Sequence, residues 1–414
     1  MSEKLAIHGG PPVRTESFAS WPVYHDDEAE ALLRVLGSGK WGRLHGEEVS
    51  RFERRFAAFQ QAAHAVAVPS GTVALRIALL AAGIQAGDEV IVPPYTFLAT
   101  ATAVVEVNAT PVFADVELET FNLDPRAVEA AVTDRTRVVI PVHLGGLPAD
   151  MDAIRQIAAR HDLIVIEDAA HAHGAQYKDR RVGALGQMGC FSFQSSKNLT
   201  AGEGGAVLTD DDELAARCRS IHNCGRAEGG AWYEHHTIAG NYRMTEFQGA
   251  VLNCQLDRLE EQAVRREANG KLLAERLGRL DGIVPQLRTD ACTRHGYHLF
   301  AFRLDPQALG ASREAFLEAV RAEGVPVSAG YVVPLYRQPL FAKLAFGPYT
   351  GFRSARPQLD YASVHCPNCE TLCTQQGAWL TQNILLGSRQ DIDDVARAFE
   401  KVHAGRHSLV PQPT

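Results

Sequence analysis

The sequence lacks the features that would direct a protein to a membrane, to nucleic acid or to the secretory pathway. No apolar run reaches the roughly 20 residues that a membrane-spanning helix needs, and residues 1–14 lack the hydrophobic stretch of a signal peptide. The 41 Lys and Arg residues are outnumbered by 49 Asp and Glu, and the net charge of -8 disfavours nucleic acid and anionic membranes as partners. Only eight cysteines occur in 414 residues, which suits free thiols in a reducing compartment. We therefore expect a cytoplasmic protein.

What the chain does contain is a regular alternation of apolar, strand-like runs and helix-like segments. Strands that alternate with helices indicate an α/β fold, in which helices cover both faces of a mostly parallel sheet. In such a sheet, ligands bind beyond the carboxyl ends of the strands. The expected strands are residues 65–68, 89–92, 110–114, 137–142 and 163–167, and the expected helices are 26–36, 47–59, 73–82, a segment from about 96, and 151–160.

The chain is expected to divide into an arm and two domains. Residues 1–25, which Gly and Pro interrupt repeatedly, form the N-terminal arm, and residues 26–285 form the large domain. A long helix, continuous or broken, begins at about residue 244 and leads to a smaller C-terminal α+β domain, residues 286–414. Within the small domain we expect strands at 297–304 and 325–328 and helices at 313–323 and 392–403.

Lys197 stands in a polar loop between two expected strands, residues 190–194 and 206–209, and a glycine-rich run at 202–205 follows it. Such a position packs the stem of the side chain and leaves the amine accessible to small molecules. An amine placed in this way can lose part of its solvation, titrate at lower pH and form a Schiff base. An ordinary solvated lysine is the alternative, and the loop alone does not exclude it.

Two further polar features follow expected strands. Ser70, Gly71 and Thr72 mark a strand-to-helix turn, where N–H groups and hydroxyls at a helix start can bind phosphate; a plain helix cap is the alternative. Asp168 follows the apolar run 163–167, either as a structural ion-pair partner or as the counter-charge of a ring nitrogen. At about 4 Å and an effective dielectric near 20, such a pair gains roughly 4 kcal/mol, or about three pKa units, before desolvation.

The phosphate cradle, the carboxylate and the lysine occur in this order, each at the end of an expected strand. Together they describe a site for pyridoxal 5'-phosphate (PLP). The lysine would hold the aldehyde as a Schiff base and the aspartate would hold the ring nitrogen in its protonated form. The helix start and its hydroxyls would hold the phosphate.

These features lie in longer stretches that resemble the DegT/StrS-type sugar aminotransferases, a branch of the fold type I aspartate aminotransferase superfamily. The similarity runs from about residue 5 to 400 and looks closest to the scyllo-inosose aminotransferase and amino-hydroxybenzoate synthase branch. It implies a three-layer α/β/α large domain with a mostly parallel, seven-stranded sheet. The matching stretches are residues 69–83, 87–104, 141–154, 165–175, 191–207 and 240–252.

The resemblance also implies roles for individual residues. His171 stands where many family members have a glutamine that contacts the ring oxygen, which leaves its role open because an imidazole can donate or accept. Asn241 would reach the phosphate of a neighbouring subunit, which implies a homodimer with its active sites at the interface. The remaining roles are the Schiff base and proton transfer for Lys197, the ring nitrogen for Asp168, the phosphate for Gly71, Thr72 and Ser192, and stacking on the ring for Phe97, with Tyr95 as the less favoured stacker.

A family variant with histidine in place of the lysine carries out sugar deoxygenation, so the presence of Lys197 indicates transamination. Glutamate or glutamine would convert the cofactor to its pyridoxamine phosphate form, and a keto-sugar or keto-cyclitol would then take the amino group. This chemistry belongs to amino-sugar, aminocyclitol or related secondary-metabolite biosynthesis. Two alternatives remain: a dehydratase similar to amino-hydroxybenzoate synthase, and a PLP-binding regulatory protein without turnover.

Several other signals are weaker. The spacing of His365, Cys366, Cys369 and Cys373 is metal-like, but zinc sites generally pair two such clusters and no second cysteine pair follows, so we expect no metal. His235 and His236 either line the substrate pocket or lie in a solvated loop, and Arg243 is a candidate for binding the donor carboxylate. Loops around 222–240 and 325–340 would select the acceptor.

Overall fold

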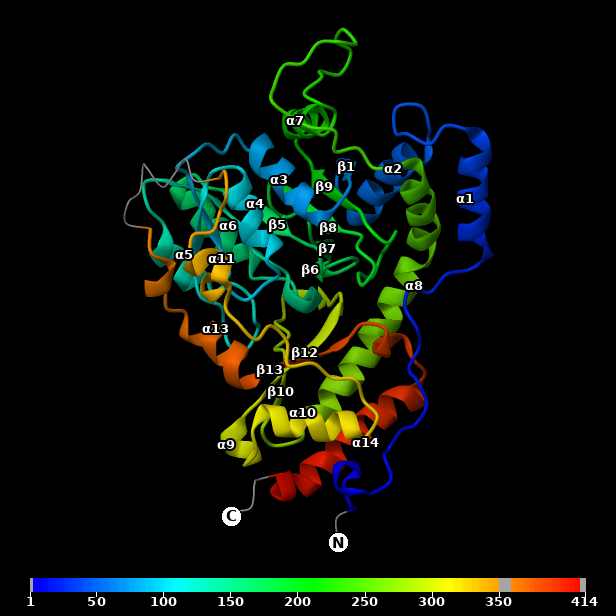
Figure 1. Cartoon of the computed structure of the whole chain (residues 1–414), viewed down its shortest axis with the longest axis vertical. Helices are drawn as coiled ribbons and strands as arrows, with labels where there is room; N and C mark the ends of the chain where they lie inside the picture. Colours follow the sequence, from blue (N-terminus) through cyan, green and yellow to red (C-terminus); the bar gives the residue numbers. More distant parts are fainter. Residues whose placement is uncertain (1–2, 350–358, 410–414) are drawn as a thin grey trace.

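A seven-stranded sheet forms the centre of the upper part of the molecule in Figure 1. The computed structural model describes residues 3–349 and 359–409. Every strand except β9 runs in the same direction, and β9 is antiparallel to both of its neighbours, which confirms the mostly parallel sheet. The strand order is β1 (His64–Val68), β9 (Gly205–Thr209), β8 (Met188–Ser192), β5 (Ile164–Asp168), β4 (Thr136–Val139), β2 (Glu89–Val92) and β3 (Thr110–Phe113).

Helices cover both faces of this sheet and enclose two apolar cores. One core lies under α3, α4 and α7 and contains Ile77 and Val104. The other lies under α2, α5, α6 and α8 and contains Phe52, Phe56 and Ile154. Because both faces are covered, all residues of β2, β8 and β9 are buried, which explains their continuous apolar sequences. The helices that cover the sheet are α2 (Glu48–Gln60), α3 (Gly71–Ala81), α4 (Ala99–Glu106), α5 (Pro125–Ala131), α6 (Met151–His161), α7 (Asp212–His222) and α8 (Glu246–Leu277). Helix α1 (Asp26–Ser38) packs on the outer side of α8.

The helix α8 is unbroken over its 32 residues and links the two sheets. Its N-terminal half packs against α1 and α2, and its C-terminal half packs against α14. A capping box at Thr245 and Gln248 fixes its start. The second sheet is antiparallel and has its own apolar core beneath α10 and α14. Its strands are β10 (Ile283–Pro285), β12 (Leu299–Leu304) and β13 (Gly377–Thr381), and the helices beside it are α9 (Pro306–Leu309), α10 (Arg313–Ala322) and α14 (Arg389–Gly405).

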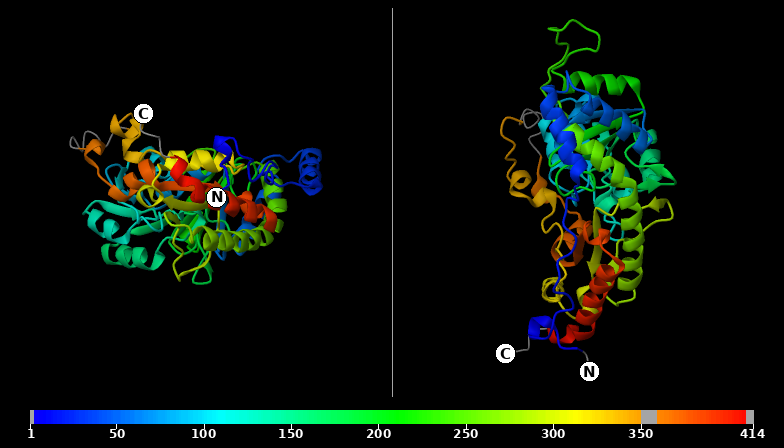
Figure 2. Two further views of the ribbon diagram at one scale, coloured as in Figure 1. Left: turned by 90° about the horizontal axis from the view of Figure 1, so that it is seen from below. Right: turned by 90° about the vertical axis from the view of Figure 1, so that its right-hand side faces the viewer.

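The N-terminal arm packs on this second core rather than on the large sheet. Leu5 is buried there, and the fully buried carboxylate of Glu323 accepts hydrogen bonds from the backbone N–H of Ala6 (2.8 Å) and of Val13 (3.1 Å). Lys401 on α14 lies 2.8 Å from the same carboxylate. Figure 2 (right) shows the start of the arm, in blue, beside the end of α14, in red. A single buried acid therefore ties the arm to the C-terminal helices.

The segment between α10 and β13 leaves the second sheet and packs against the large sheet. Tyr336, Phe341, Tyr361 and Cys369 are buried in the same core as α3 and α4. The short helices of this region are α11 (Pro339–Ala342) and α13 (Pro367–Thr371), and a π-helical turn, Leu372–Gln376, leads from α13 into β13. A third small sheet is formed by β11 (Cys292–Arg294), β6 (Gln176–Tyr177) and β7 (Arg180–Arg181).

Besides small differences at the ends of elements, such as β4 ending at Val139 and α14 beginning at Arg389, three local expectations differ from the structure. The helix expected from about residue 96 begins at Ala99, because residues 96–98 turn away from the end of β2. The strand expected at 325–328 is absent, and only Ser328 forms a bridge, to Trp379. The helix after β1 begins two residues early, at Gly71, because the Ser70 hydroxyl caps it by accepting from the N–H of Val73 at 3.2 Å.

Among the described helices, none has the length and apolar character needed to cross a bilayer.

The aromatic cluster on α2 should carry a large share of the stability. Phe56 is fully buried and packs against Phe52, Phe191 and Phe193 with ring centroids 5.1–5.3 Å apart. We expect Phe56→Ala to lower the free energy of unfolding by about 3–5 kcal/mol. Val264→Ala, at a 52% exposed position of α8, should change it by less than about 0.5 kcal/mol. Denaturant titration of both variants checks this, and equal losses would contradict it.

Candidate active site

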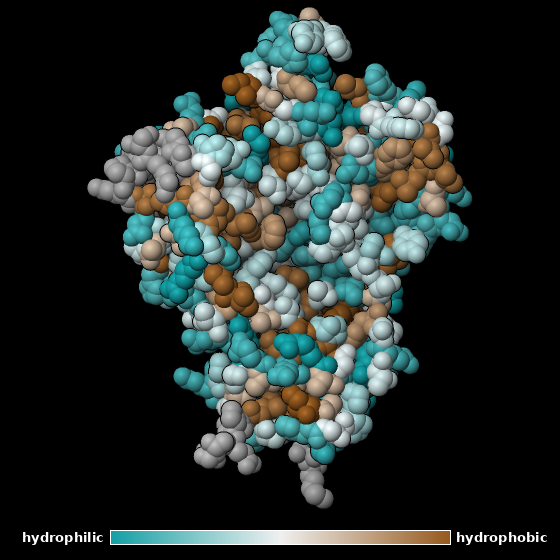
Figure 3. All heavy atoms as spheres, viewed as in Figure 1, coloured by the Kyte–Doolittle hydropathy of each residue, from teal (hydrophilic) through white to brown (hydrophobic). Residues whose placement is uncertain are grey.

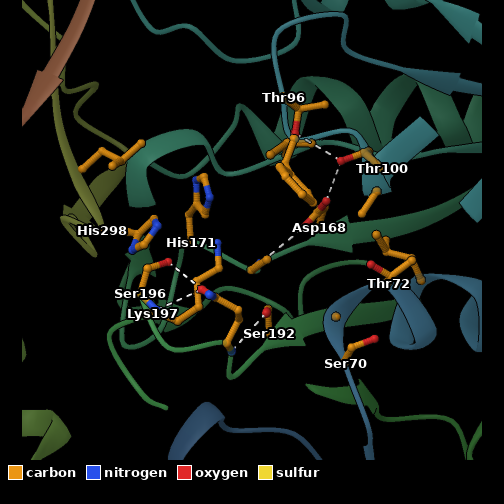
Figure 4. Close-up of a pocket in the computed structure, with 18 of the residues that line it drawn as sticks. Ser70, Thr72, Thr96, Thr100, Asp168, His171, Ser192, Ser196, Lys197 and His298 are labelled. Carbon is orange, nitrogen blue, oxygen red and sulfur yellow. Dashed lines mark hydrogen bonds between the residues drawn. The ribbon is translucent and has the colours of Figure 1, made fainter. Parts of the chain in front are cut away.

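A cavity of about 480 Å³ opens at the carboxyl ends of the parallel strands (Figure 4). The chain leaves β1 toward Ser70, β2 toward Thr96, β5 at Asp168 and β8 at Ser192, so side chains from distant parts of the sequence meet at one edge of the sheet. The second sheet closes the opposite wall of the cavity. The lining residues on this side are His298 and Leu299 at the start of β12, Tyr331 in the loop after α10, and Trp379 on β13.

Two glycines allow the start of α3 to approach the sheet closely. A Cβ atom on Gly71 would lie 2.8 Å from the Cβ of Ser192, and one on Gly205 would lie 2.5 Å from the backbone of Ser70. The free N–H groups at the start of α3 and the hydroxyls of Thr72 and Ser192 therefore share one end of the cavity. Helix starts carry a positive partial charge, so this end suits a phosphate.

Asp168 places a buried carboxylate in the middle of the cavity wall. The Thr100 hydroxyl donates to its Oδ2 at 2.8 Å, and the N–H of Ala170 donates to its Oδ1 at 3.2 Å. Burial raises the pKa of Asp168, while these two hydrogen bonds and the charge of Lys197 act in the opposite direction. Thr96 lies 3.1 Å from Thr100, hydroxyl to hydroxyl, and extends the network. The site thus holds an acid whose ionised form would gain from a cationic partner.

Lys197 lies on the loop between β8 and β9 and lines the same cavity. Its backbone N–H donates to the carbonyl of Gln194 at 2.9 Å, and Trp21 from the arm donates to the carbonyl of Ser195 at 2.8 Å, so the loop is fixed on both sides. Burial lowers the pKa of Lys197 to about 8, although the charge of Asp168 raises it. A neutral amine is therefore available near physiological pH, as Schiff-base chemistry requires.

His171 and Phe97 also line this cavity. His171 is buried, and its Nδ1 accepts from the N–H of Gly145 at 3.3 Å, so Nε2 carries the proton. Phe97 is 61% exposed, whereas Tyr95 is only 1% exposed and packs in the core against Phe121. Of these two aromatics, Phe97 alone is among the described residues that line the cavity.

Four of the residues singled out from the sequence lie away from this cavity. Asn241 is exposed and its Oδ1 accepts from the N–H of Arg243 at 3.3 Å. Arg243 donates to Oδ1 of Asn223 at 2.8 Å. His235 and His236 belong to an exposed loop at the top of Figure 1. None of the four is among the described cavity-lining residues.

The cysteines with metal-like spacing lie in the core behind the cavity. Cys369 and Cys373 are fully buried, with their sulfurs 3.9 Å apart. Burial raises the pKa of Cys366 to about 12, so this thiol is protonated. Within residues 3–349 and 359–409, no three His, Cys, Asp or Glu side chains are grouped to hold a metal ion.

Sequence reasoning missed Thr100 and His298, both of which face the site. Thr100 is the second residue of α4, and Thr96 precedes it by four residues. Threonines are common near the starts of helices, so this spacing does not mark Thr100 as a site residue. His298 precedes β12, three residues after His295, with no recognised motif around it. The sequence around Thr100 and around His298 therefore contains no pattern that distinguishes a site residue from a structural one.

The titration of Lys197 gives a direct test of this environment. In protein without added cofactor, we expect acylation of Lys197 to rise with pH about a midpoint near 8, well below the roughly 10.4 of an ordinary lysine. Because the Asp168 carboxylate stabilises the ammonium form, Asp168→Asn should move that midpoint to lower pH. Mass-spectrometric labelling profiles measure both midpoints. A midpoint near 10, or an upward shift in the variant, would contradict the prediction.

Comparison with known proteins agrees with this geometry. Residues 22–376 match the model of the DegT/DnrJ/EryC1/StrS aminotransferase family. The chain is 39% identical over 395 residues to 3-amino-5-hydroxybenzoate synthase of Amycolatopsis mediterranei (strain S699), covering 93% of this chain and 99% of that protein. It is 40% identical over 428 residues to L-glutamine:2-deoxy-scyllo-inosose aminotransferase of Micromonospora echinospora, covering 98% and 99%.

A solved structure of 3-amino-5-hydroxybenzoic acid synthase superposes with a TM-score of 0.84 at 38% identity, covering 95% of this chain and all of that one. The buried acid, the amine of lowered pKa and the glycine-built phosphate cradle fit PLP, the cofactor of this family. The chain belongs to the DegT/DnrJ/EryC1/StrS aminotransferase family and is a PLP-dependent aminotransferase.

Proposed function

We propose that this aminotransferase moves an amino group from glutamine or glutamate to the carbonyl of a keto-sugar or keto-cyclitol. Its place would be the biosynthesis of amino sugars, aminocyclitols or related secondary metabolites. The observation that carries the proposal is the cavity that Lys197 and Asp168 share, in which burial brings the pKa of the amine to about 8. The acceptor class is supported by a relative that is named for a glutamine donor and a scyllo-inosose acceptor.

PLP, when bound, supplies an aldehyde and a ring that withdraws electrons. Its phosphate would lie against the start of α3, bound by Gly71, Thr72 and Ser192. The carboxylate of Asp168 would pair with the ring nitrogen and hold that nitrogen protonated, which offsets the cost of burying the acid. Phe97 would cover the exposed face of the ring.

His171 and Lys197 would have further roles: His171 would donate a hydrogen bond, and Lys197 would transfer a proton. The Nε2–H of His171 would donate to the ring oxygen, because its Nδ1 is already bonded to Gly145. The Lys197 amine would hold the aldehyde and, once released, carry a proton between cofactor and substrate carbons. A group whose pKa is about 8 can both take up and return a proton at neutral pH.

A homodimer with active sites at the interface completes the proposal. Leu33, Leu36, Trp41 and Leu44 are each at least 50% exposed around α1, and Figure 3 shows an apolar patch on the right of the molecule over that helix. Such a patch suits burial against a second copy. The exposed Asn241 would then reach the phosphate of the partner's cofactor. We also propose that the protein is cytoplasmic. Its chain would consist of an N-terminal arm up to residue 25, a large domain up to residue 285 and a small C-terminal domain.

A second candidate reaction has a specific observation in its favour. The relatives include 3-amino-5-hydroxybenzoate synthase, at 39% identity and with a similar solved structure. A dehydration and aromatisation on the same cofactor would use the same lysine and aspartate. The two reactions differ in their products: transamination releases one keto acid per amino group, whereas dehydration releases water without it.

The donor and acceptor can be tested in separate half-reactions. We expect glutamine or glutamate to convert the visible spectrum of the PLP-loaded protein to that of the pyridoxamine form, with one equivalent of keto acid. Lys197→Ala should slow this by at least about 1,000-fold, because the proton carrier is lost. The donor-loaded protein is then offered free cyclitol ketones and nucleotide-linked keto-sugars. Water loss without keto acid would favour the dehydratase, and an unchanged spectrum would refute transamination.

Mixed dimers test the shared site. If Asn241 serves the partner's cofactor, a mixture of Lys197→Ala and Asn241→Ala subunits contains heterodimers with one intact site. Random assembly of two inactive variants should then restore about a quarter of the wild-type activity. Lys197→Ala mixed with Asp168→Asn is the matched control, because both residues act in their own subunit and no activity should return. Equal results in the two mixtures would refute the shared site.

A further inference from the structure

His298 lies on the cavity wall, at the end away from the phosphate cradle. It immediately precedes β12 of the second sheet and is only 6% exposed. Its ring centroid is 4.3 Å from that of His171, with the ring planes tilted by 41°. Figure 4 shows both rings on the side of Lys197, with Ser70 and Thr72 across the cavity. His298 therefore borders the space in which a substrate carbonyl would meet the cofactor.

The neighbour of Lys197 fixes the tautomer of His298. The side-chain Nδ2 of Asn198 donates to the carbonyl of Gly296 at 2.7 Å. The amide oxygen of Asn198 must then face His298, whose Nδ1 lies 3.3 Å away. An amide oxygen only accepts, so Nδ1 of His298 carries the proton. In a neutral ring the other nitrogen, Nε2, is left as an acceptor.

The ring is neutral because its surroundings disfavour a second proton. Burial and the nearby charge of Lys197 lower the pKa of His298 well below its usual value, and His171, His173 and Arg266 act in the same direction. Within the described ranges, no hydrogen bond is formed to Nε2 of His298. His171 has the opposite tautomer, with Nε2–H as donor. The two rings thus offer one donor and one acceptor.

The backbone before His298 is held in an unfavourable conformation. Tyr297 has φ +45°, in the left-handed region that bulky residues avoid. Its N–H donates to Nδ1 of His295 at 2.8 Å, and the N–H of Gly296 donates to the carbonyl of Gly146 at 2.8 Å. The Tyr297 ring packs on Gly270 of α8, where a Cβ would come within 2.4 Å of the ring. Strain held by so many contacts is typical of a functional position.

We propose that His298 recognises the amino acceptor, with its Nε2 accepting a hydrogen bond from a hydroxyl of a polyhydroxylated ring ketone. This inference rests on the proposed function, because it takes the acceptor to be a sugar or cyclitol. A carbonyl and a carboxylate are themselves acceptors and cannot pair with Nε2, whereas a ring hydroxyl can. Asn198 acts as the positioning residue that keeps Nε2 free of its proton.

The test uses scyllo-inositol, a ring of six hydroxyls without a carbonyl, which binds but cannot react. Its Kd is measured by calorimetry on the protein in its pyridoxamine phosphate form, which is the form that meets the acceptor, and on three variants. His298→Phe, which keeps the ring but loses the acceptor, should weaken binding about tenfold. His298→Gln, which restores an acceptor, should bind within about threefold of the wild type. His403→Phe, on α14 and outside the cavity lining, is the matched control and should not change the Kd.

The outcomes separate this inference from the proposed function. If neither glutamine nor glutamate changes the spectrum of the wild-type protein, the proposed function fails. If a donor does react but His298→Phe binds scyllo-inositol as tightly as the wild type, or the wild type does not bind it, the role of His298 is refuted. A loss in His298→Phe confined to the glutamine half-reaction would also refute it, because the donor amide would then be the partner.

A variant that leaves His298 in place covers the case in which His298→Phe fails to retain PLP. Asn198→Leu removes the acceptor that fixes the Nδ1 proton, so the proton can move to Nε2. We expect it to weaken scyllo-inositol binding about threefold while the donor half-reaction still proceeds. Unchanged binding in Asn198→Leu, with PLP retained, would overturn the inference.

Discussion

The arrangement of the site depends on one buried negative charge, the carboxylate of Asp168 at the end of β5. Burial disfavours its ionised form, and the protein offsets this only in part, with the Thr100 hydroxyl, the Ala170 N–H and the charge of Lys197. An acid in this state gains from a cation that enters the cavity, and a protonated ring nitrogen is such a cation. The same burial lowers the pKa of Lys197 to about 8. Exclusion of water from one cavity therefore shifts the pKa values of both groups, upward for the acid and downward for the amine.

The sheet decides where these groups meet. Because β1, β2, β5 and β8 are parallel, their carboxyl ends lie at one edge, and the residues that follow them converge there. The close approach of α3 to β8 and β9 then needs glycine at positions 71 and 205, since a side chain at either would overlap the neighbouring backbone or Ser192. The cofactor end of the cavity is therefore built by strand direction and by the close packing of α3 on the sheet.

The substrate end has a different origin. Its wall comes from the second sheet and from the loop after α10, through His298, Trp379 and Tyr331. The helix α8 joins that sheet to the large one, and its Gly270 receives the Tyr297 ring that holds His298 in place. The two sheets thus supply different parts of the site: the large sheet places the acid and the amine, and the smaller sheet places His298 and Trp379 on the facing wall.

The sequence by itself determined the mostly parallel sheet, the ends of most strands to within one or two residues, and the positions of Lys197, Asp168 and the turn at residues 70–72, because periodicity and turn chemistry are local. It did not determine that α4 begins at Ala99, that residues 325–328 form no strand, or that Tyr95 is buried while Phe97 is exposed. Nor could it find the bond from Thr100 to Asp168, 68 residues apart, or the pairing of Asn198 with His298, 100 residues apart. Those contacts exist only once the two sheets have packed, because they depend on distances between segments that no local pattern encodes.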